Sequence, residues 1–148
     1  MAWWCKRGMS LDDLISSLQI PVLFRSCPKV ILFHLGGNDL TKHSLKCIFK
    51  IIIEAVTYVH QAFPEVKIIW VDILPRVTWG EHACSLKAIE KKRKRVNQMG
   101  RKQSNGHITV DIDVLTLGFF RDDGIHLSDV GLEFYNDAIR EGILSYIL

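Results

Sequence analysis

The feature that most restricts the fold is a largely apolar run, Val30 to Leu35, that stops at two glycines. It has the length of a strand and is apolar on both faces, which is typical of a central strand in a parallel sheet covered by helices on each side. A second run, residues 66–74, has the same character and ends at Pro75. Residues 107–114 form a shorter, alternating run that we expect nearer a sheet edge.

Helical patterns separate these runs. Apolar residues recur at helical spacing in four segments, namely residues 10–19, 42–63, 85–102 and 128 to the C-terminus. Ser10, followed three residues later by Asp13, predicts a capping box at the start of the first helix. Because strands and helices alternate without a linker or a repeat, we predict a single parallel α/β domain over residues 1–148 with right-handed crossovers.

Composition excludes several classes of protein. The cysteines have no paired spacing, which argues against a disulfide scaffold and a zinc ribbon. His82 and Cys84 lack further ligands nearby, so we expect no metal site there. No apolar run reaches the roughly 18–20 residues of a membrane span, and the first eight residues lack the apolar stretch of a signal peptide. We therefore expect a soluble, cytoplasmic domain without a membrane span, whose oligomeric state the sequence leaves open.

Positive charge is concentrated in one segment. Residues 85–103 contain eight Lys or Arg and one acid, Glu90, so the segment carries +7 in a chain whose net charge is +3. The apolar stripe of the predicted helix leaves most of these cations outward, which favours a solvated helix face. A patch that binds nucleic acid through phosphates, or a localisation signal, stays open as an alternative.

Two polar segments lie where a parallel α/β sheet places its ligand sites, at the carboxyl ends of strands. Gly36-Gly37-Asn38-Asp39 follows the first strand, and Asn38 offers a neutral donor that can stabilise negative charge on an oxygen. Asp123 and His126 precede the last helix, at a spacing that lets the carboxylate hold Nδ1–H and leaves Nε2 as a base. Each segment also has a structural interpretation: a turn in which Asp39 caps the next helix, and a loop histidine beside capping acids.

Together, the Gly-x-Asn-Asp turn and the Asp-x-x-His pair resemble the SGNH, or GDSL-like, hydrolase superfamily. Four phrases carry a similarity to the esterase-like domains of vertebrate and transposon-derived proteins, namely Leu35–Leu40, Trp70–Arg76, Lys92–Asn97 and Asp123–Asp129. The resemblance covers nearly the whole chain. It implies a three-layer α/β/α fold with a flavodoxin-like parallel sheet. It also implies a domain that acts on a small-molecule carboxylic ester without a cofactor.

The resemblance also implies roles for individual residues. His126 would be the base and Asp123 its orienting partner. Asn38 and Gly8 would supply donors to the oxyanion, and Asp39 would support the geometry of the loop.

The first motif of the family, an apolar strand followed by Gly-Asp-Ser, is absent from this sequence. Gly8-Met-Ser10 imitates it, but Ser10 precedes Asn38 by only 28 residues, which is too short for the elements that the family places there. We interpret Ser10 as a helix cap. Because loss of the nucleophile costs on the order of 10⁶ in rate, we expect a fragment of a longer hydrolase-like domain that lacks its first strand and has little or no activity.

Two other interpretations stay open. The chain is a non-catalytic interaction domain, associated with nucleic acid through residues 85–103, or it is a decayed gene product without a function. Trp3 and Trp4 either pack in a second strand or lie at an exposed edge.

Overall fold

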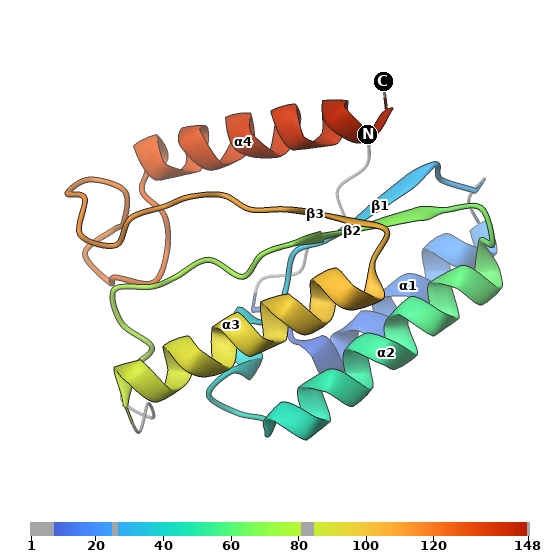
Figure 1. Ribbon diagram of the computed structural model, residues 1–148, viewed down its shortest axis with the longest axis horizontal. Coiled ribbons are helices and arrows are strands. Elements are labelled where there is room, and N and C mark those ends of the chain that lie inside the picture. The colour runs from blue at the N-terminus through green and yellow to red at the C-terminus, as the bar shows by residue number, and fades with distance from the viewer. Residues whose placement is uncertain (1–7, 25–26, 81–84, 148) are drawn as a thin grey trace.

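The computed structural model describes residues 8–24, 27–80 and 85–147, so that Trp3, Trp4, His82 and Cys84 lie outside the described residues. Two short 3-10 helices are labelled η. The elements, in chain order, are η1 (Leu11–Asp13), α1 (Leu14–Phe24), β1 (Val30–Phe33), η2 (Gly37–Asp39), α2 (Leu45–Ala62), β2 (Lys67–Val71), α3 (Leu86–Gln103), β3 (Gly106–Ile108) and α4 (Asp129–Ile147). The predicted alternation of strands and helices is confirmed (Figure 1).

Among the described residues, three strands form one parallel sheet in the order β1-β2-β3, so that β1 lies at an edge of this sheet and not at its centre, where its apolar run predicted it. Val30 lies opposite Lys67, and Ile69 lies opposite Gly106. The third predicted strand therefore lies at an edge, as its alternating pattern indicated. It is shorter than expected, because regular pairing stops at Ile108 although Val110 and Ile112 stay buried.

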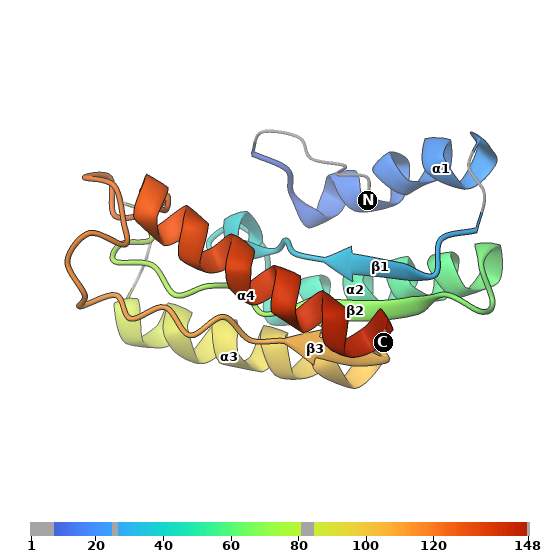
Figure 2. The ribbon, with the colours of Figure 1, turned by 90° about the horizontal axis from the view of Figure 1, so that it is seen from above.

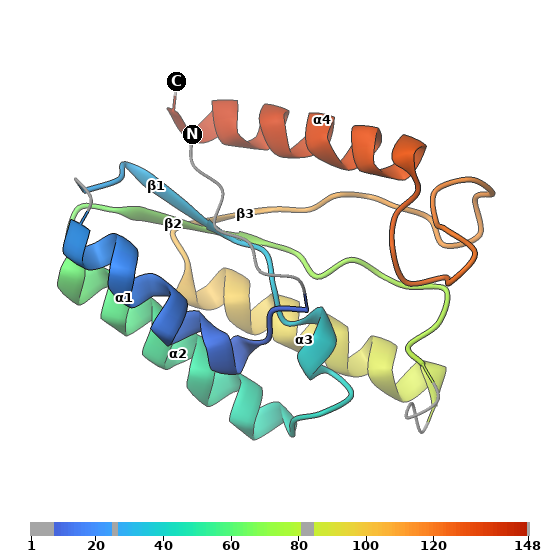
Figure 3. The same ribbon diagram turned by 180° about the vertical axis from the view of Figure 1, so that it is seen from behind.

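Helices cover both faces of this sheet. α1, α2 and α3 lie on one face and α4 lies on the other (Figures 1 and 2), and Figure 3 shows the first three side by side from behind. Strand residues alternate accordingly: Ile68 and Trp70 join the core beneath α1 to α3, whereas Ile69 and Val71 join the core beneath α4. The α/β fold with helices on both faces is confirmed.

Serine residues fix where the helices begin. The backbone N–H of Ser10 donates to the Asp13 carboxylate at 3.1 Å, which confirms the predicted capping box. α2 starts at Leu45, later than its apolar pattern indicated, because the Ser44 hydroxyl caps it by accepting the N–H of Cys47 at 3.2 Å. In the part of the chain that the structure describes, no helix has both the length and the apolar character needed to cross a membrane.

Candidate active site

The turn before α4 holds Asp123 and His126 together. Phe120 and Leu127 form an antiparallel bridge that closes the turn. Within it, Asp123 Oδ1 accepts the backbone N–H groups of Ile125 at 2.8 Å and of His126 at 2.9 Å. Asp123 Oδ2 lies 2.8 Å from Nδ1 of His126. Because an ionised carboxylate only accepts, Nδ1 must be the protonated nitrogen, and Nε2 is left available as a base.

The electrostatics of this pair favour an ionised carboxylate. The hydrogen bond from the backbone of His126, followed by the one from its imidazole, holds the pKa of Asp123 far below its ordinary value. The side chain of His126 is 71% exposed. The pair therefore combines an anionic orienting group with an imidazole that a ligand in solution can reach.

Gly124 attaches this turn to the segment that follows β2. Its carbonyl accepts the N–H groups of Val77 at 2.9 Å and of Thr78 at 3.2 Å. Gly124 has a φ of +64°, and an added Cβ would lie 3.0 Å from Cβ of Val77. A glycine is therefore required both by the backbone conformation and by the close approach of the two segments.

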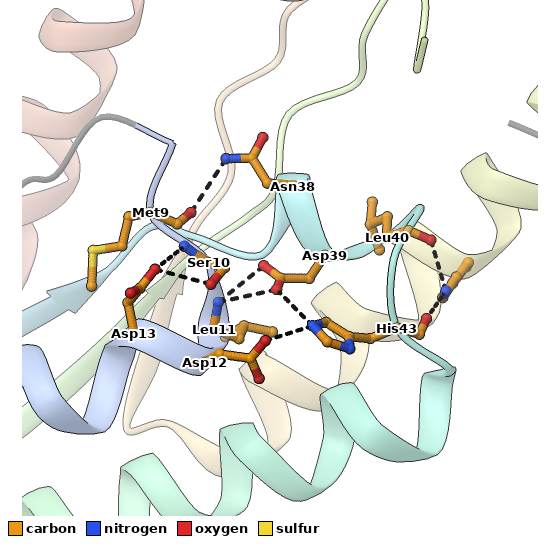
Figure 4. Close-up of polar contacts among 10 residues, drawn as sticks. Met9, Ser10, Leu11, Asp12, Asp13, Asn38, Asp39, Leu40 and His43 are labelled. Atoms are coloured by element: carbon orange, nitrogen blue, oxygen red, sulfur yellow. Dashed lines mark hydrogen bonds and ion pairs between the residues drawn. The ribbon is translucent and has the colours of Figure 1, made fainter. Parts of the chain in front are cut away.

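Asn38 lies in η2, just after the end of β1, and Gly8 directly precedes Met9, the residue to which Asn38 donates. The amide Nδ2 of Asn38 donates to the carbonyl of Met9 at 3.2 Å (Figure 4), and its Oδ1 accepts from Nη2 of Arg76 at 3.3 Å. An amide NH₂ group has two N–H donors, so one remains for a ligand. Gly8 has a φ of +68° and is exposed. Asn38 thus connects η2 to the residues beside Gly8.

Asp39 anchors the same loop from inside. Its side chain is fully buried, and both oxygens lie 3.1 Å from the N–H of Leu11 (Figure 4). Burial raises the pKa of Asp39, and the hydrogen bond from Leu11 opposes this rise. Asp39 does not cap α2, since Ser44 does, so the capping interpretation was wrong. It supports the geometry of the loop, as the resemblance implied.

A small polar cluster surrounds Asp39. Nε2 of His43 lies 2.8 Å from Asp12 and 3.6 Å from Asp39 (Figure 4). Among the described residues, these three form a group whose ligand atoms all lie within 4.8 Å of one another. Since His43 forms a hydrogen bond with Asp12 and lies within ion-pair distance of Asp39, we interpret the cluster as the link between η1 and the loop that carries Asn38.

A cavity of about 480 Å³ brings the predicted site residues together. Gly8, Asn38 and His126 all line it, whereas Asp123 is not among the lining residues and is joined to the site by its hydrogen bond with His126. Of the described residues that line the cavity, none is Ser, Thr or Cys. Ser10 is not among them, and its hydroxyl donates to the Asp13 carboxylate at 3.0 Å, which agrees with its interpretation as a cap.

Four further polar residues line the cavity that sequence reasoning did not single out: His34, Arg76, Arg121 and Tyr135. The rings of His34 and Tyr135 lie 5.1 Å apart. Desolvation within the cavity, followed by the nearby Arg76 cation, lowers the pKa of His34 to about 4, and burial raises the pKa of Tyr135. His34 is thus a neutral imidazole at neutral pH. In the sequence, only their position could have pointed to His34 and Arg76, because they lie at the ends of the two strongest predicted strands, where parallel sheets place their ligand sites.

Solved structures resemble this fold, whereas no protein-family model and no curated protein matches the chain. An acetyl esterase mutant with an acetate ion superimposes with a TM-score of 0.70 at 21% identity, over 95% of this chain and 69% of its own. A carbohydrate esterase family 3 from Talaromyces cellulolyticus gives 0.70 at 20%, over 95% and 69%. A GDSL-like lipase from Bacteroides thetaiotaomicron gives 0.70 at 14%, over 95% and 73%. The chain has the SGNH hydrolase fold.

The SGNH fold accounts for the location of the cavity. In such parallel sheets the loops at the carboxyl ends of the strands meet at one edge. Here the loops that follow β1 and β2 line the cavity together with the turn before α4. The predicted fold is therefore confirmed, and the chain spans about 70% of each of these neighbours.

Proposed function

We propose that this cavity hydrolyses carboxylic esters, with His126 as the general base. The observation that carries the proposal is the 2.8 Å contact between Asp123 and Nδ1 of His126, beside a cavity that Asn38 and Gly8 also line. The neighbouring folds support an ester substrate, since they are an acetyl esterase, a carbohydrate esterase and a lipase.

The described residues fit a direct general-base route. Nε2 of His126 takes a proton from water as the water oxygen bonds to the carbonyl carbon, and the carbonyl electron pair moves onto its oxygen. The free N–H of Asn38 and the backbone N–H of Gly8 donate to that oxyanion. The ester C–O bond then breaks, and the imidazolium returns the proton to the leaving alkoxide.

The expected rate is low because no nucleophilic side chain takes part. A triad enzyme stripped of its nucleophile retains roughly 10³–10⁴-fold catalysis over water, about 10⁶ below the intact enzyme. We propose that the chain is an N-terminally truncated SGNH domain. A longer product that supplies an apolar strand ending in Gly-x-Ser would use the same four residues through an acyl-enzyme.

The test is hydrolysis of p-nitrophenyl acetate by the purified chain, by His126→Ala and by His107→Ala. His107 is an exposed histidine on β3 outside the cavity lining, so its variant measures nonspecific imidazole reactivity. We expect His126→Ala to lower the rate above buffer at least tenfold, imidazole to restore part of it, and His107→Ala to leave it unchanged. Activity that both variants lower equally, or that neither lowers, would remove His126 as the base.

A further inference from the structure

The structure holds Arg76 in the cavity by three contacts. Its Nη2 donates to Asn38 Oδ1 at 3.3 Å, and its guanidinium lies 4.8 Å from the ring centre of the buried Trp79. The third contact is with Gly37, where an added Cβ would lie 2.7 Å from Nη2. The guanidinium is therefore positioned by residues that leave it room and give it no negative charge.

No carboxylate in the described part of the chain forms an ion pair with Arg76 within 4.0 Å. Asp123 is the acid whose field acts on Arg76, but its two oxygens are taken up by the N–H groups of its own turn and by His126. A guanidinium has five N–H donors, and Asn38 accepts one of them. Arg76 thus presents a cation with donors to spare.

The charges around the cavity also favour an anionic ligand. Arg76 and Arg121 line it, and none of the described lining residues is Asp or Glu. Arg121 lies at the exposed rim, 4.0 Å from Asp129, whereas Arg76 is partly buried and unpaired. A concave site with one sign of charge concentrates the opposite charge. A guanidinium matches the planar, two-oxygen geometry of a carboxylate.

We propose that Arg76 binds a carboxylate group of the ligand, so that the site selects esters that also carry a carboxylate, such as half-esters of dicarboxylic acids. This substrate class rests on the proposed ester hydrolysis. His126 acts on the ester carbonyl, while Arg76 holds the anionic end of the same molecule. Because Arg76 also contacts Asn38, an occupied guanidinium keeps the amide donor of Asn38 in place.

The test measures binding and needs no turnover. The purified chain is titrated by NMR with monomethyl succinate and with dimethyl succinate, which differ by one negative charge. We expect the monoanion to bind at least tenfold more tightly than the neutral diester, and 0.5 M NaCl to reduce this preference. Arg76→Gln should abolish the preference. Arg140→Gln is the matched control, since Arg140 is an exposed arginine on α4 that pairs with Asp137 at 3.2 Å; it should keep the preference.

Several results would overturn the proposal. Equal affinity of the two esters for the unaltered chain would do so, as would a preference that survives Arg76→Gln. If the glutamine variant fails to fold, Arg76→Lys replaces it and should weaken the preference without removing it. A preference that Arg76→Lys leaves unchanged, or that it removes completely, contradicts a two-oxygen contact. Tighter binding of methyl phosphate than of monomethyl succinate would overturn the carboxylate assignment. Anion preference without His126-dependent hydrolysis contradicts the proposed function alone.

Discussion

The Asp123–His126 pair is built almost entirely by its own turn. Two backbone N–H groups and one imidazole nitrogen bind a single carboxylate within four residues of chain. The orientation of the imidazole therefore depends little on distant packing. This local construction is also why the pair could be predicted from the sequence, since a spacing of three residues places the two side chains together in any tight turn.

Replacement of Asp123 by Asn tests this pair. The amide can still accept the backbone N–H groups, but it no longer fixes Nδ1 as the protonated nitrogen or stabilises the imidazolium. We expect the His126-dependent rate of ester hydrolysis to fall at least tenfold, with the fold unchanged by circular dichroism. Asp122→Asn, at the exposed neighbouring position, is the control and should retain the rate. Similar losses in both variants would indicate a general charge effect.

His34, Arg76 and Tyr135 show what the sequence does not reveal. His34 follows β1, Arg76 lies in the segment after β2 and Tyr135 lies on α4, so they share a cavity only because these three parts of the chain pack together. Their types carry no motif, so that position after a predicted strand was the available signal for the first two. Tyr135 was indistinguishable from a core residue on the apolar stripe of the last helix.

The helix α3 does not leave all of its cations in solvent, although its sequence favoured a solvated helix face. Lys92 donates to the backbone carbonyls of Leu40 and His43, and Arg93 donates to Glu90 and to the carbonyl of Ile73 at 2.7 Å. Arg101 pairs with the buried Asp72. These three cations hold the loops after β1 and β2, so charge reversal at Lys92 or Arg93 would disturb the fold rather than report on nucleic acid. The outward cations of α3 are Lys87, Lys91, Lys94, Arg95 and Lys102.

Close packing of α3 on β2 gives a second prediction. A Cβ added at Gly100 would overlap the ring of Trp70, which is 1% exposed and enclosed by the core. Overpacking of this kind costs about 1–3 kcal/mol, whereas alanine gains about 1 kcal/mol over glycine in a helix. We expect Gly100→Ala to lower the free energy of unfolding in urea, and Lys94→Ala on the outer face to change it by less than about 0.5 kcal/mol. A stabilised Gly100→Ala variant would contradict the packing described for Trp70.

Periodicity predicted these elements well because it reflects burial. Most of the predicted stripe on α2 and on α3 faces the sheet, with Ile52 and Val96 fully enclosed, but Ile53 and Leu86, which the same patterns placed inward, are exposed. Boundaries were less accurate, since they depend on caps and pairing partners. Val110 and Ile112 keep the inward alternation of a strand, yet no described strand pairs with them beyond Ile108.

In the whole molecule, as far as its described residues go, there are two cores of unequal size, one on each face of the sheet. The core beneath α1, α2 and α3 is the larger, and the core beneath α4 is the smaller. α4 also leaves large apolar side chains exposed, among them Val130, Phe134 and Leu144. Less buried apolar area means a smaller free energy for local opening.

Hydrogen exchange followed by mass spectrometry measures this difference. We expect the backbone amides of α4 to exchange faster than those of α2, because α4 buries Tyr135 and Ile139 where α2 buries a continuous stripe from Ile48 to Val59. Equal or greater protection of α4 would show that the two faces open as one cooperative unit.

The division into two cores also divides the candidate site. Asn38 is attached through Met9 and Asp39 to the larger core, whereas the turn with Asp123 and His126 packs through Phe120 and Leu127 on the smaller one. The free energy that assembles the cavity is therefore that of docking α4 and its preceding turn onto the sheet, not that of folding the whole chain. A population that retains most of its helix and sheet would thus already have lost the proposed alignment of base and oxyanion donors, so we expect heat to abolish any His126-dependent hydrolysis before it unfolds the chain.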